Sequence, residues 1–179
     1  MKVFGCQICG YAYLGEEKPT RCPFCGVYEK HIAPLPELRE YGKIEGLPEH
    51  TIKDLHKALR LEYEDKFHYE CGKENAGNKV NRLIMDQLSK HERRHAHAIE
   101  EILGIEKDSV EVPRQCIGVE PGAKNFEEQV FDIAIERERE AIEFYNKIAK
   151  ESDHPRIREL FYALSEVEYE HSLLAKVHS

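Results

Sequence analysis

Four cysteines near the N-terminus are spaced as the ligands of one metal ion. Cys6 and Cys9 form one Cys-x-x-Cys pair, and Cys22 and Cys25 form a second pair after 12 intervening residues. Two such pairs supply four thiolates in tetrahedral geometry. A glycine after each pair lets the backbone turn so that its amides can approach the sulfurs. The spacing fits both zinc, which would be a structural ion, and iron, which would carry single electrons.

A second set of side chains combines four carboxylates with two imidazoles. Glu and His three residues apart share one helix face, so each of two Glu-x-x-His motifs can hold a metal ion. The set consists of Glu62, Glu92, His95, Glu138, Glu168 and His171. Burying four carboxylates without cations is prohibitively costly, whereas two divalent ions balance their charge. One Glu from each of two helices and Glu-x-x-His from each of two others is the di-iron or di-manganese carboxylate arrangement.

The set recurs at a constant offset, which indicates an internal repeat. A shift of 76 residues places Glu62 on Glu138 and Tyr69 on Tyr145, and it also superimposes the two Glu-x-x-His motifs. Two copies of one helical hairpin, related by a pseudo-two-fold axis, would bring their polar residues face to face. Two alternatives remain open: a bundle with these residues on a solvated face, and a structural zinc site. Simple core packing is the alternative for the two tyrosines.

Helical periodicity dominates the chain after a linker rich in proline and glycine. The apolar stripes predict helices over about 51–71, 79–103, 125–150 and 153–179, with Thr51 as the first N-cap and Gly104 as a helix stop. Short joins make each pair an antiparallel hairpin, and one long crossover over 104–124 is typical of a ferritin-like bundle. The expected fold is mainly α, a ferritin-like four-helix bundle preceded by a small metal-binding module. The expected domains are 1–35 for the module, 36–50 for the linker and 51–179 for the bundle.

Composition restricts the function classes further. The formal net charge of −8 argues against a nucleic-acid partner, which favours a basic face. No apolar run is long enough to span a membrane, and the N-terminal residues lack a signal-peptide pattern. We therefore expect a cytoplasmic protein, in whose reducing environment the six cysteines would be ligands or thiols rather than disulfides.

Together, the two constellations resemble those of the rubrerythrin family. The segment from Cys6 to Gly26 resembles a rubredoxin domain, and the Glu62–His171 pattern resembles the ferritin-like erythrin domain. The rubredoxin-like part comes first, as in reverse rubrerythrins. The resemblance implies a non-haem di-iron peroxidase for oxidative-stress defence that reduces hydrogen peroxide to water. Electrons would come from NADH through a reductase or rubredoxin and then through iron at the four cysteines. The alternative is a ferritin-like protein that binds and oxidises iron with oxygen as the oxidant.

The resemblance also implies roles and an assembly. Glu62 and Glu138 match the carboxylate ligands of the first and third helices, and Tyr69 and Tyr145 match tyrosines near the site. The Glu-x-x-His residues match the remaining carboxylate and imidazole ligands. A homodimer or higher oligomer is implied, with the rubredoxin centre of one subunit near the di-iron site of its partner. Rubrerythrins carry a further glutamate three residues after the third-helix ligand. Ala141 stands there, and the pseudo-symmetric position holds Asp65, a candidate ligand.

The remaining cysteines and histidines receive no metal role. We expect Cys71 to lie at a helix end and Cys116 to be a loop thiol. His91 and His97 are expected on the surface of the second helix, and His68 is expected near the proposed site.

Overall fold

The computed structural model describes residues 1–39 and 42–179. Four long helices and a small sheet confirm the expected fold class, a ferritin-like bundle with an N-terminal module. The helices are α1 (Glu49–Asn75), α2 (Lys79–Leu103), α3 (Phe126–Glu151) and α4 (Pro155–His178). The module contains strands β1 (Lys2–Cys6), β2 (Ala12–Gly15) and β3 (Ile32–Pro34), with short 3₁₀ helices at Glu29–His31 and Leu35–Glu37.

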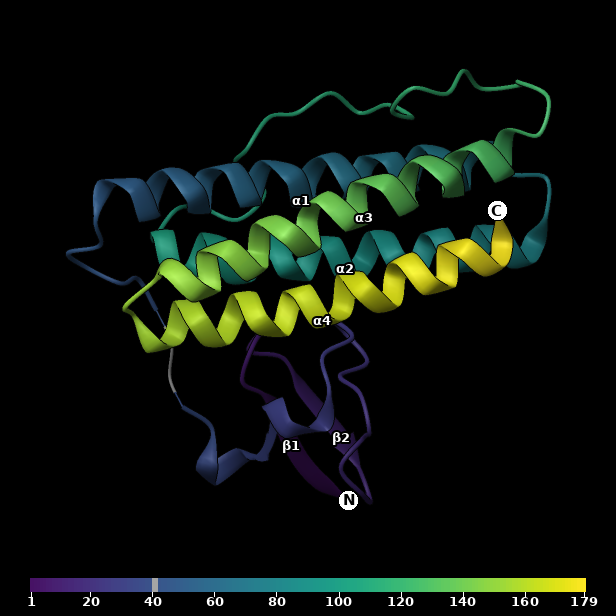
Figure 1. Cartoon of the computed structure of the whole chain (residues 1–179). Helices are drawn as coiled ribbons and strands as arrows, with labels where there is room; N and C mark the ends of the chain where they lie inside the picture. The colour runs from purple at the N-terminus through teal and green to yellow at the C-terminus, as the bar shows by residue number, and fades with distance from the viewer. Residues whose placement is uncertain (40–41) are drawn as a thin grey trace.

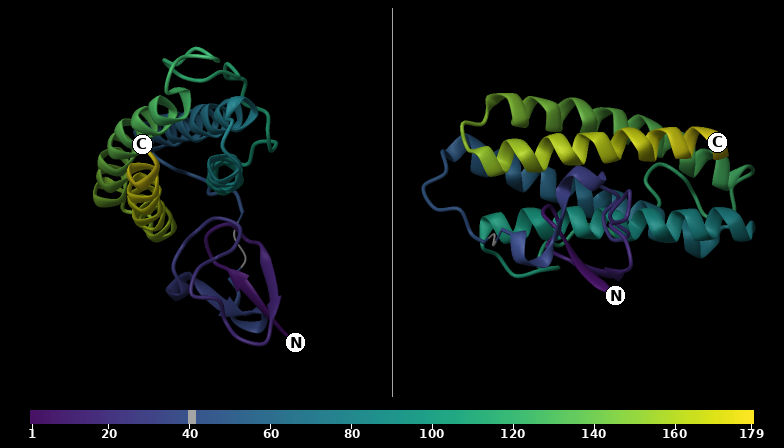
Figure 2. Two further views of the ribbon diagram at one scale, coloured as in Figure 1. Left: turned by 90° about the vertical axis from the view of Figure 1, so that its right-hand side faces the viewer. Right: turned by 90° about the horizontal axis from the view of Figure 1, so that it is seen from below.

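The helices form two antiparallel hairpins that pack face to face. Helix α1 packs mainly on α2, and α3 packs mainly on α4. The crossover between α2 and α3 runs along the face formed by α1 and α3, whereas the N-terminal module lies against α2 and α4 (Figures 1 and 2). This single long crossover is the connection expected for a ferritin-like bundle.

Local sequence explains where the helices begin and end. The predicted Thr51 N-cap was wrong: Thr51 is buried inside α1, which begins after Pro48, a residue whose ring fixes an extended entry. Asn78 caps α2, accepting from the backbone N–H groups of Val80 and Asn81. Gly104 ends α2 in the left-handed conformation, φ +67°, as predicted.

The module is a β2-β1-β3 antiparallel sheet with two metal-binding turns beside it. Strand β1 places Phe4 opposite Tyr13 on one side and opposite Pro34 on the other. Buried Ile8 and Val27, one in each turn, pack in a cluster that continues into the bundle core. The module therefore shares its small apolar core with the helices.

A disulfide fixes the crossover to α1, contrary to the expectation of free thiols. Cys71 and Cys116 are bonded across a sequence separation of 45 residues, with Cα atoms 5.2 Å apart. Cys71 also lies within α1, which continues to Asn75, rather than at the helix end. The sequence could not indicate this pairing because it depends on the path by which the crossover returns over α1.

Two further expectations concern the chain as a whole. None of the helices in the described ranges is long and apolar enough to cross a bilayer. The domain boundaries stay predictions, and residues 40–41 of the predicted linker 36–50 lie outside the described residues.

Candidate metal centres

The Sγ atoms of the four module cysteines all lie within 4.8 Å of one another. The Sγ atoms of Cys6 and Cys25 lie 3.7 Å apart, and those of Cys9 and Cys22 lie 3.8 Å apart. A tetrahedron with metal–sulfur bonds of about 2.3 Å has edges of about 3.8 Å, so one metal ion fits among them. All four side chains are buried, and burial raises the pKa of the Cys25 thiol. A bound cation would reverse this effect and stabilise the thiolate.

The turn that follows each cysteine pair has the conformation that glycine permits. Gly10 and Gly26 adopt φ values of +73° and +77°. Their N–H groups donate to the carbonyl oxygens of Cys6 and Cys22, respectively, at 3.0 Å. The predicted turn at each glycine is therefore confirmed by the backbone geometry, whereas the approach of its amides to the sulfurs stays a prediction.

The carboxylates and imidazoles of the bundle form two overlapping groups of ligand atoms. One group contains Glu62, Glu92, His95 and Glu168, and the other contains Glu92, Glu138, Glu168 and His171. Within each group the ligand atoms lie within 4.8 Å of one another. Glu92 and Glu168 belong to both groups, so each can bridge two metal ions. The structure thus brings together all six side chains of the repeated motif.

Each imidazole turns Nδ1 toward the carboxylates. His95 Nδ1 lies 3.1 Å from oxygens of both Glu92 and Glu168, and 3.3 Å from Glu62 Oε2. His171 Nδ1 lies 2.8 Å from Glu168 Oε2 and 3.0 Å from Glu92 Oε1. The Glu138 Oε1 atom is 3.9 Å away. The two halves of the site therefore repeat the same geometry.

The donor set fits a pair of divalent cations. Glu92 Oε1, both Glu168 carboxylate oxygens and His171 Nδ1 are buried, and their contacts of 2.8–3.1 Å with one another and with His95 Nδ1 lack hydrogen-bond geometry within the described residues. Such orphaned atoms are costly unless a cation satisfies them. Oxygen and imidazole ligands without thiolates suit iron or manganese. The cluster can therefore hold two iron ions.

The electrostatics of the site also favour a bound cation. Burial, with the Glu168 charge, raises the pKa of Glu62 to about 8 and that of Glu138 well above its usual range. Burial lowers the pKa of His171, but the Glu92 and Glu168 carboxylates outweigh it and raise the value to about 10. Without metal, the cluster therefore retains protons, which cations must displace.

The two tyrosines hold one carboxylate each. Tyr145 Oη donates to Glu62 Oε1 at 2.6 Å, and Tyr69 Oη donates to Glu138 Oε1 at 2.8 Å. Each bond crosses between α1 and α3, and each tyrosine is buried. Their side chains thus orient the two carboxylates that are not shared, beyond simple core packing.

His95 connects the cluster to the cysteine site within one chain. Its Nε2 donates to the carbonyl oxygen of Cys25 at 2.9 Å, because a carbonyl can only accept. This bond leaves Nδ1 of the neutral ring as the ligand atom. The resemblance implied such proximity between subunits, whereas here the two centres are adjacent in a single subunit.

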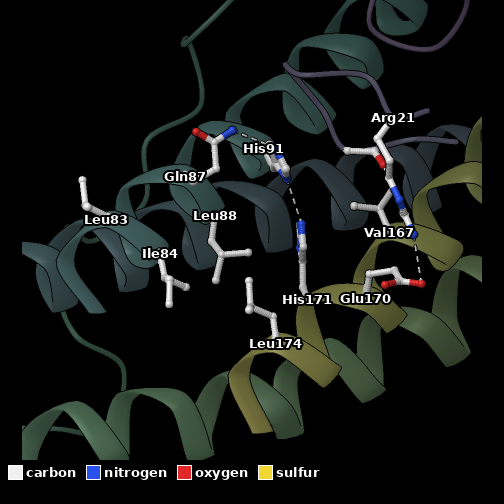
Figure 3. Close-up of a pocket in the computed structure, with 11 residues that line it drawn as sticks. Arg21, Leu83, Ile84, Gln87, Leu88, His91, Val167, Glu170, His171 and Leu174 are labelled. Atoms are coloured by element: carbon white, nitrogen blue, oxygen red, sulfur yellow. Dashed lines mark hydrogen bonds and ion pairs between the residues drawn. The ribbon is translucent and has the colours of Figure 1, made fainter. Parts of the chain in front are cut away.

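His91 lies at the site rather than on the surface, contrary to the prediction. Its Nδ1 is 3.1 Å from His171 Nε2, and its Nε2 is 3.0 Å from Gln87 Nε2 (Figure 3). Burial first, and then His171 and His95, lower its pKa to about 3, so the ring is neutral near pH 7. The sequence spacing could have indicated this position, because His91 precedes His95 by four residues and therefore lies on the same helix face.

Asp65 lies outside both ligand groups. Its carboxylate pairs with the Arg137 guanidinium, which also contacts Glu64 at 3.3 Å. Burial raises the pKa of Asp65 to about 7 despite the arginine. Ala141, at the position of the additional glutamate of the family, is buried and offers no ligand.

The other histidines have structural partners. His97 is buried against Asp108, with Nε2 3.4 Å from Oδ1, so its predicted surface position was wrong. His68 turns away from the cluster: Nε2 donates to the Val130 carbonyl, and Nδ1 accepts from the Ile117 N–H, both at 2.9 Å. It therefore links α1, α3 and the crossover.

Comparison with known proteins identifies the family of the helical bundle. The family model described as Rubrerythrin matches residues 53–178. A curated protein named Reverse rubrerythrin-1, from Clostridium acetobutylicum, is 58% identical over 26 residues, which are 14% of each chain. That similarity therefore spans a small part of the relative's length. No solved structure matches the chain.

Proposed function

Because this chain belongs to the rubrerythrin family, a group of di-iron oxidative-stress proteins, we propose that it reduces hydrogen peroxide to water. The observation that carries the proposal is the pair of ligand groups sharing Glu92 and Glu168, linked through His95 to Cys25. A two-electron reduction needs two one-electron metal ions at one site and a route by which they regain electrons. The geometry supports both requirements.

The protein side chains would hold the ions and control the protons. Glu92 and Glu168 would bridge the two ions, while Glu62 with His95 and Glu138 with His171 would each complete one position. A pair of ferrous ions held by these residues would supply two electrons for the reduction of the peroxide, which also takes up two protons to form two waters. Tyr69 and Tyr145 hold protons at their Oη atoms, directed at Glu138 and Glu62. The His95–Cys25 hydrogen bond joins the two centres and supports electron return from the cysteine site.

Partners and location belong to the same proposal. The electrons would come from NADH through a reductase or a separate rubredoxin, with iron rather than zinc at the four cysteines. The active form would be a cytoplasmic homodimer or higher oligomer.

A second candidate is a ferritin-like protein that binds and oxidises iron with oxygen. Ala141 favours this interpretation, because the site lacks the extra glutamate of the family and is nearly symmetric. Oxidation of the anaerobically reduced protein by equimolar peroxide or oxygen separates the two. Faster oxidation by peroxide, with turnover, is expected, whereas rapid oxidation by oxygen with negligible peroxide turnover would favour the ferritin-like function.

Glu92→Ala tests the assignment directly. Since Glu92 serves both ion positions, the variant should fold, keep iron at the cysteines and lose most bundle iron and all peroxide turnover. Iron content per chain, helical circular dichroism and peroxidase assays measure these outcomes. Glu101→Ala, in the same helix but outside both groups, is the control and should behave as the unmodified protein. Full activity of Glu92→Ala would reject the di-iron assignment.

A further inference from the structure

An apolar groove lies between α2 and α4, directly beside the carboxylate cluster. Its volume is about 440 Å³, and its apolar walls are formed mainly by Leu83, Ile84, Leu88, Val167 and Leu174. One of its lining residues is His171, whose other ring nitrogen faces the carboxylates. A single imidazole ring thus separates this groove from the proposed di-iron site.

The groove has an apolar compartment and a polar wall. Figure 3 shows Leu83, Ile84, Leu88 and Leu174 on one side of the hydrogen-bonded His91–His171 pair. Arg21 of the module and Glu170 form an ion pair on the other side, at 3.1 Å. The exposed fractions of Leu83 and Leu174 are 61% and 39%, so the compartment opens to solvent. A molecule in it would meet hydrocarbon along its length and polar atoms at the histidine pair.

The size and lining do not suit hydrogen peroxide alone. Two oxygen atoms need the volume of about two waters, roughly 60 Å³. A groove of 440 Å³ with leucine and isoleucine walls falls instead in the range of sites that bind small organic molecules. A peroxide with a hydrocarbon substituent would use both features, since its tail would be desolvated by the leucines and its oxygens would point to His91 and His171.

From this juxtaposition, and resting on the proposed peroxide reduction, we propose that the groove binds organic hydroperoxides, ROOH, as a second substrate class. The hydrocarbon group would occupy the compartment formed by Leu83, Ile84, Leu88 and Leu174, and the peroxide end would enter beside His171. The O–O bond breaks, two electrons from the reduced site and two protons from solvent are consumed, and ROH and H₂O form. No reactant besides those of hydrogen peroxide reduction is required.

Binding without turnover gives the first test. Cumyl alcohol, the product of cumene hydroperoxide, should bind the purified full-length protein in isothermal titration. Leu174→Trp fills the compartment and should weaken this binding at least tenfold. Leu173→Trp is the matched control, because this neighbouring leucine is similarly exposed, at 43%, but does not line the groove. Leu83→Glu, at the exposed rim, should also weaken binding through its charge.

Kinetics with two peroxides give the second test. Leu174→Trp should lower kcat/KM for cumene hydroperoxide at least tenfold relative to kcat/KM for hydrogen peroxide, whereas Leu173→Trp should leave that ratio within twofold. Absence of alcohol binding, or equal effects of both tryptophan variants, would overturn the groove assignment even if hydrogen peroxide is turned over.

Two other results have separate meanings. Alcohol binding that Leu174→Trp abolishes, without turnover of any peroxide, would support the groove as an organic-ligand site and overturn the proposed function instead. A protein dimer that Leu174→Trp dissociates would show that a second copy covers the groove, and this too would overturn the assignment.

Discussion

His95 joins the chemistry of the two metal centres in one side chain. Its Nδ1 faces three carboxylates, and its Nε2 donates to the backbone of a cysteine ligand. His171 repeats the first half of this arrangement but has His91 in place of the carbonyl. The pseudo-two-fold symmetry of the ligands is therefore not matched by their outer partners, so the two ion positions should differ in electron access.

The tyrosines offer a matched pair of tests at this scale. Tyr145→Phe removes the donor to Glu62, which serves only the position with His95, and Tyr69→Phe removes the donor to Glu138 at the other position. Loss of such an outer partner typically lowers metal affinity roughly 10- to 100-fold. In chelator competition, each variant should therefore bind one iron ion more weakly by about this factor and bind the other with nearly unchanged affinity.

The control for these variants is an exposed tyrosine of the same bundle. Tyr162→Phe, on the surface of α4, should retain both affinities. Equal weakening of both irons in Tyr145→Phe and Tyr69→Phe would mean that the hydroxyls act through general packing instead of through individual carboxylates.

The helices could be predicted because their apolar stripes are long and periodic. The groups that contact the ligand side chains from outside the cluster could not be predicted. The repeated Glu, His and Tyr positions interrupt apolar stripes, so their convergence followed from helical geometry alone. His91 and His97 were misplaced because their burial depends on α4 and on the loop after α2, which no local pattern specifies. The Cys25–His95 contact likewise depends on how the module docks.

The crossover should be the element most sensitive to reduction. The Cys71–Cys116 disulfide encloses all of α2 within a 45-residue separation, and closing a loop of that size stabilises a fold by roughly 2–4 kcal/mol. The Cys71→Ser, Cys116→Ser double variant should lose about this much free energy of unfolding in urea titrations. A reducing agent should have the same effect on the unmodified protein and no effect on the double variant. Equal stability of all these forms would contradict the prediction.

His68, which accepts a hydrogen bond from the crossover, should also make the stability of the fold sensitive to acid. Burial lowers its pKa from 6.5 to about 4, so the unfolded chain takes up a proton on this residue before the folded one does. Its contribution to stability is therefore present above pH 6.5 and lost as pH falls toward 4. The difference of about 2.5 pKa units corresponds to roughly 3 kcal/mol.

The test compares unfolding midpoints over this pH range. His68→Gln can keep a hydrogen bond without titrating, so its stability should fall less steeply than that of the unmodified protein between pH 6.5 and 4. His50→Gln, exposed at the start of α1, should retain the full acid dependence. An unchanged slope in His68→Gln would assign the acid sensitivity to other groups.

At the scale of the whole molecule, the module docks on the bundle through contacts that surround the Cys25 turn. Tyr28 Oη donates to Glu170 at 2.6 Å, Lys30 pairs with Glu166 at 2.5 Å, and Arg156 donates to the Ile8 carbonyl at 3.0 Å. These contacts press Gly26 against the bundle: a Cβ there would lie 3.0 Å from Val167 Cγ1 and 3.1 Å from His91 Nδ1. The proposed electron return between the centres would therefore depend on a close backbone approach that glycine, at φ +77°, makes without displacing its neighbours.

Gly10 supplies the matched control for this approach, because it has nearly the same left-handed φ but open space where a Cβ would project, with no neighbouring atom within 4 Å. Gly10→Ala and Gly26→Ala should therefore each lose about 1 kcal/mol of stability from backbone strain alone. Only Gly26→Ala should also displace the turn from His95 and slow re-oxidation of the cysteine-bound iron by the oxidised bundle, measured anaerobically by stopped-flow absorbance. If both variants slow this step equally, strain within the turns, and not docking of the module on α2 and α4, controls communication between the two centres.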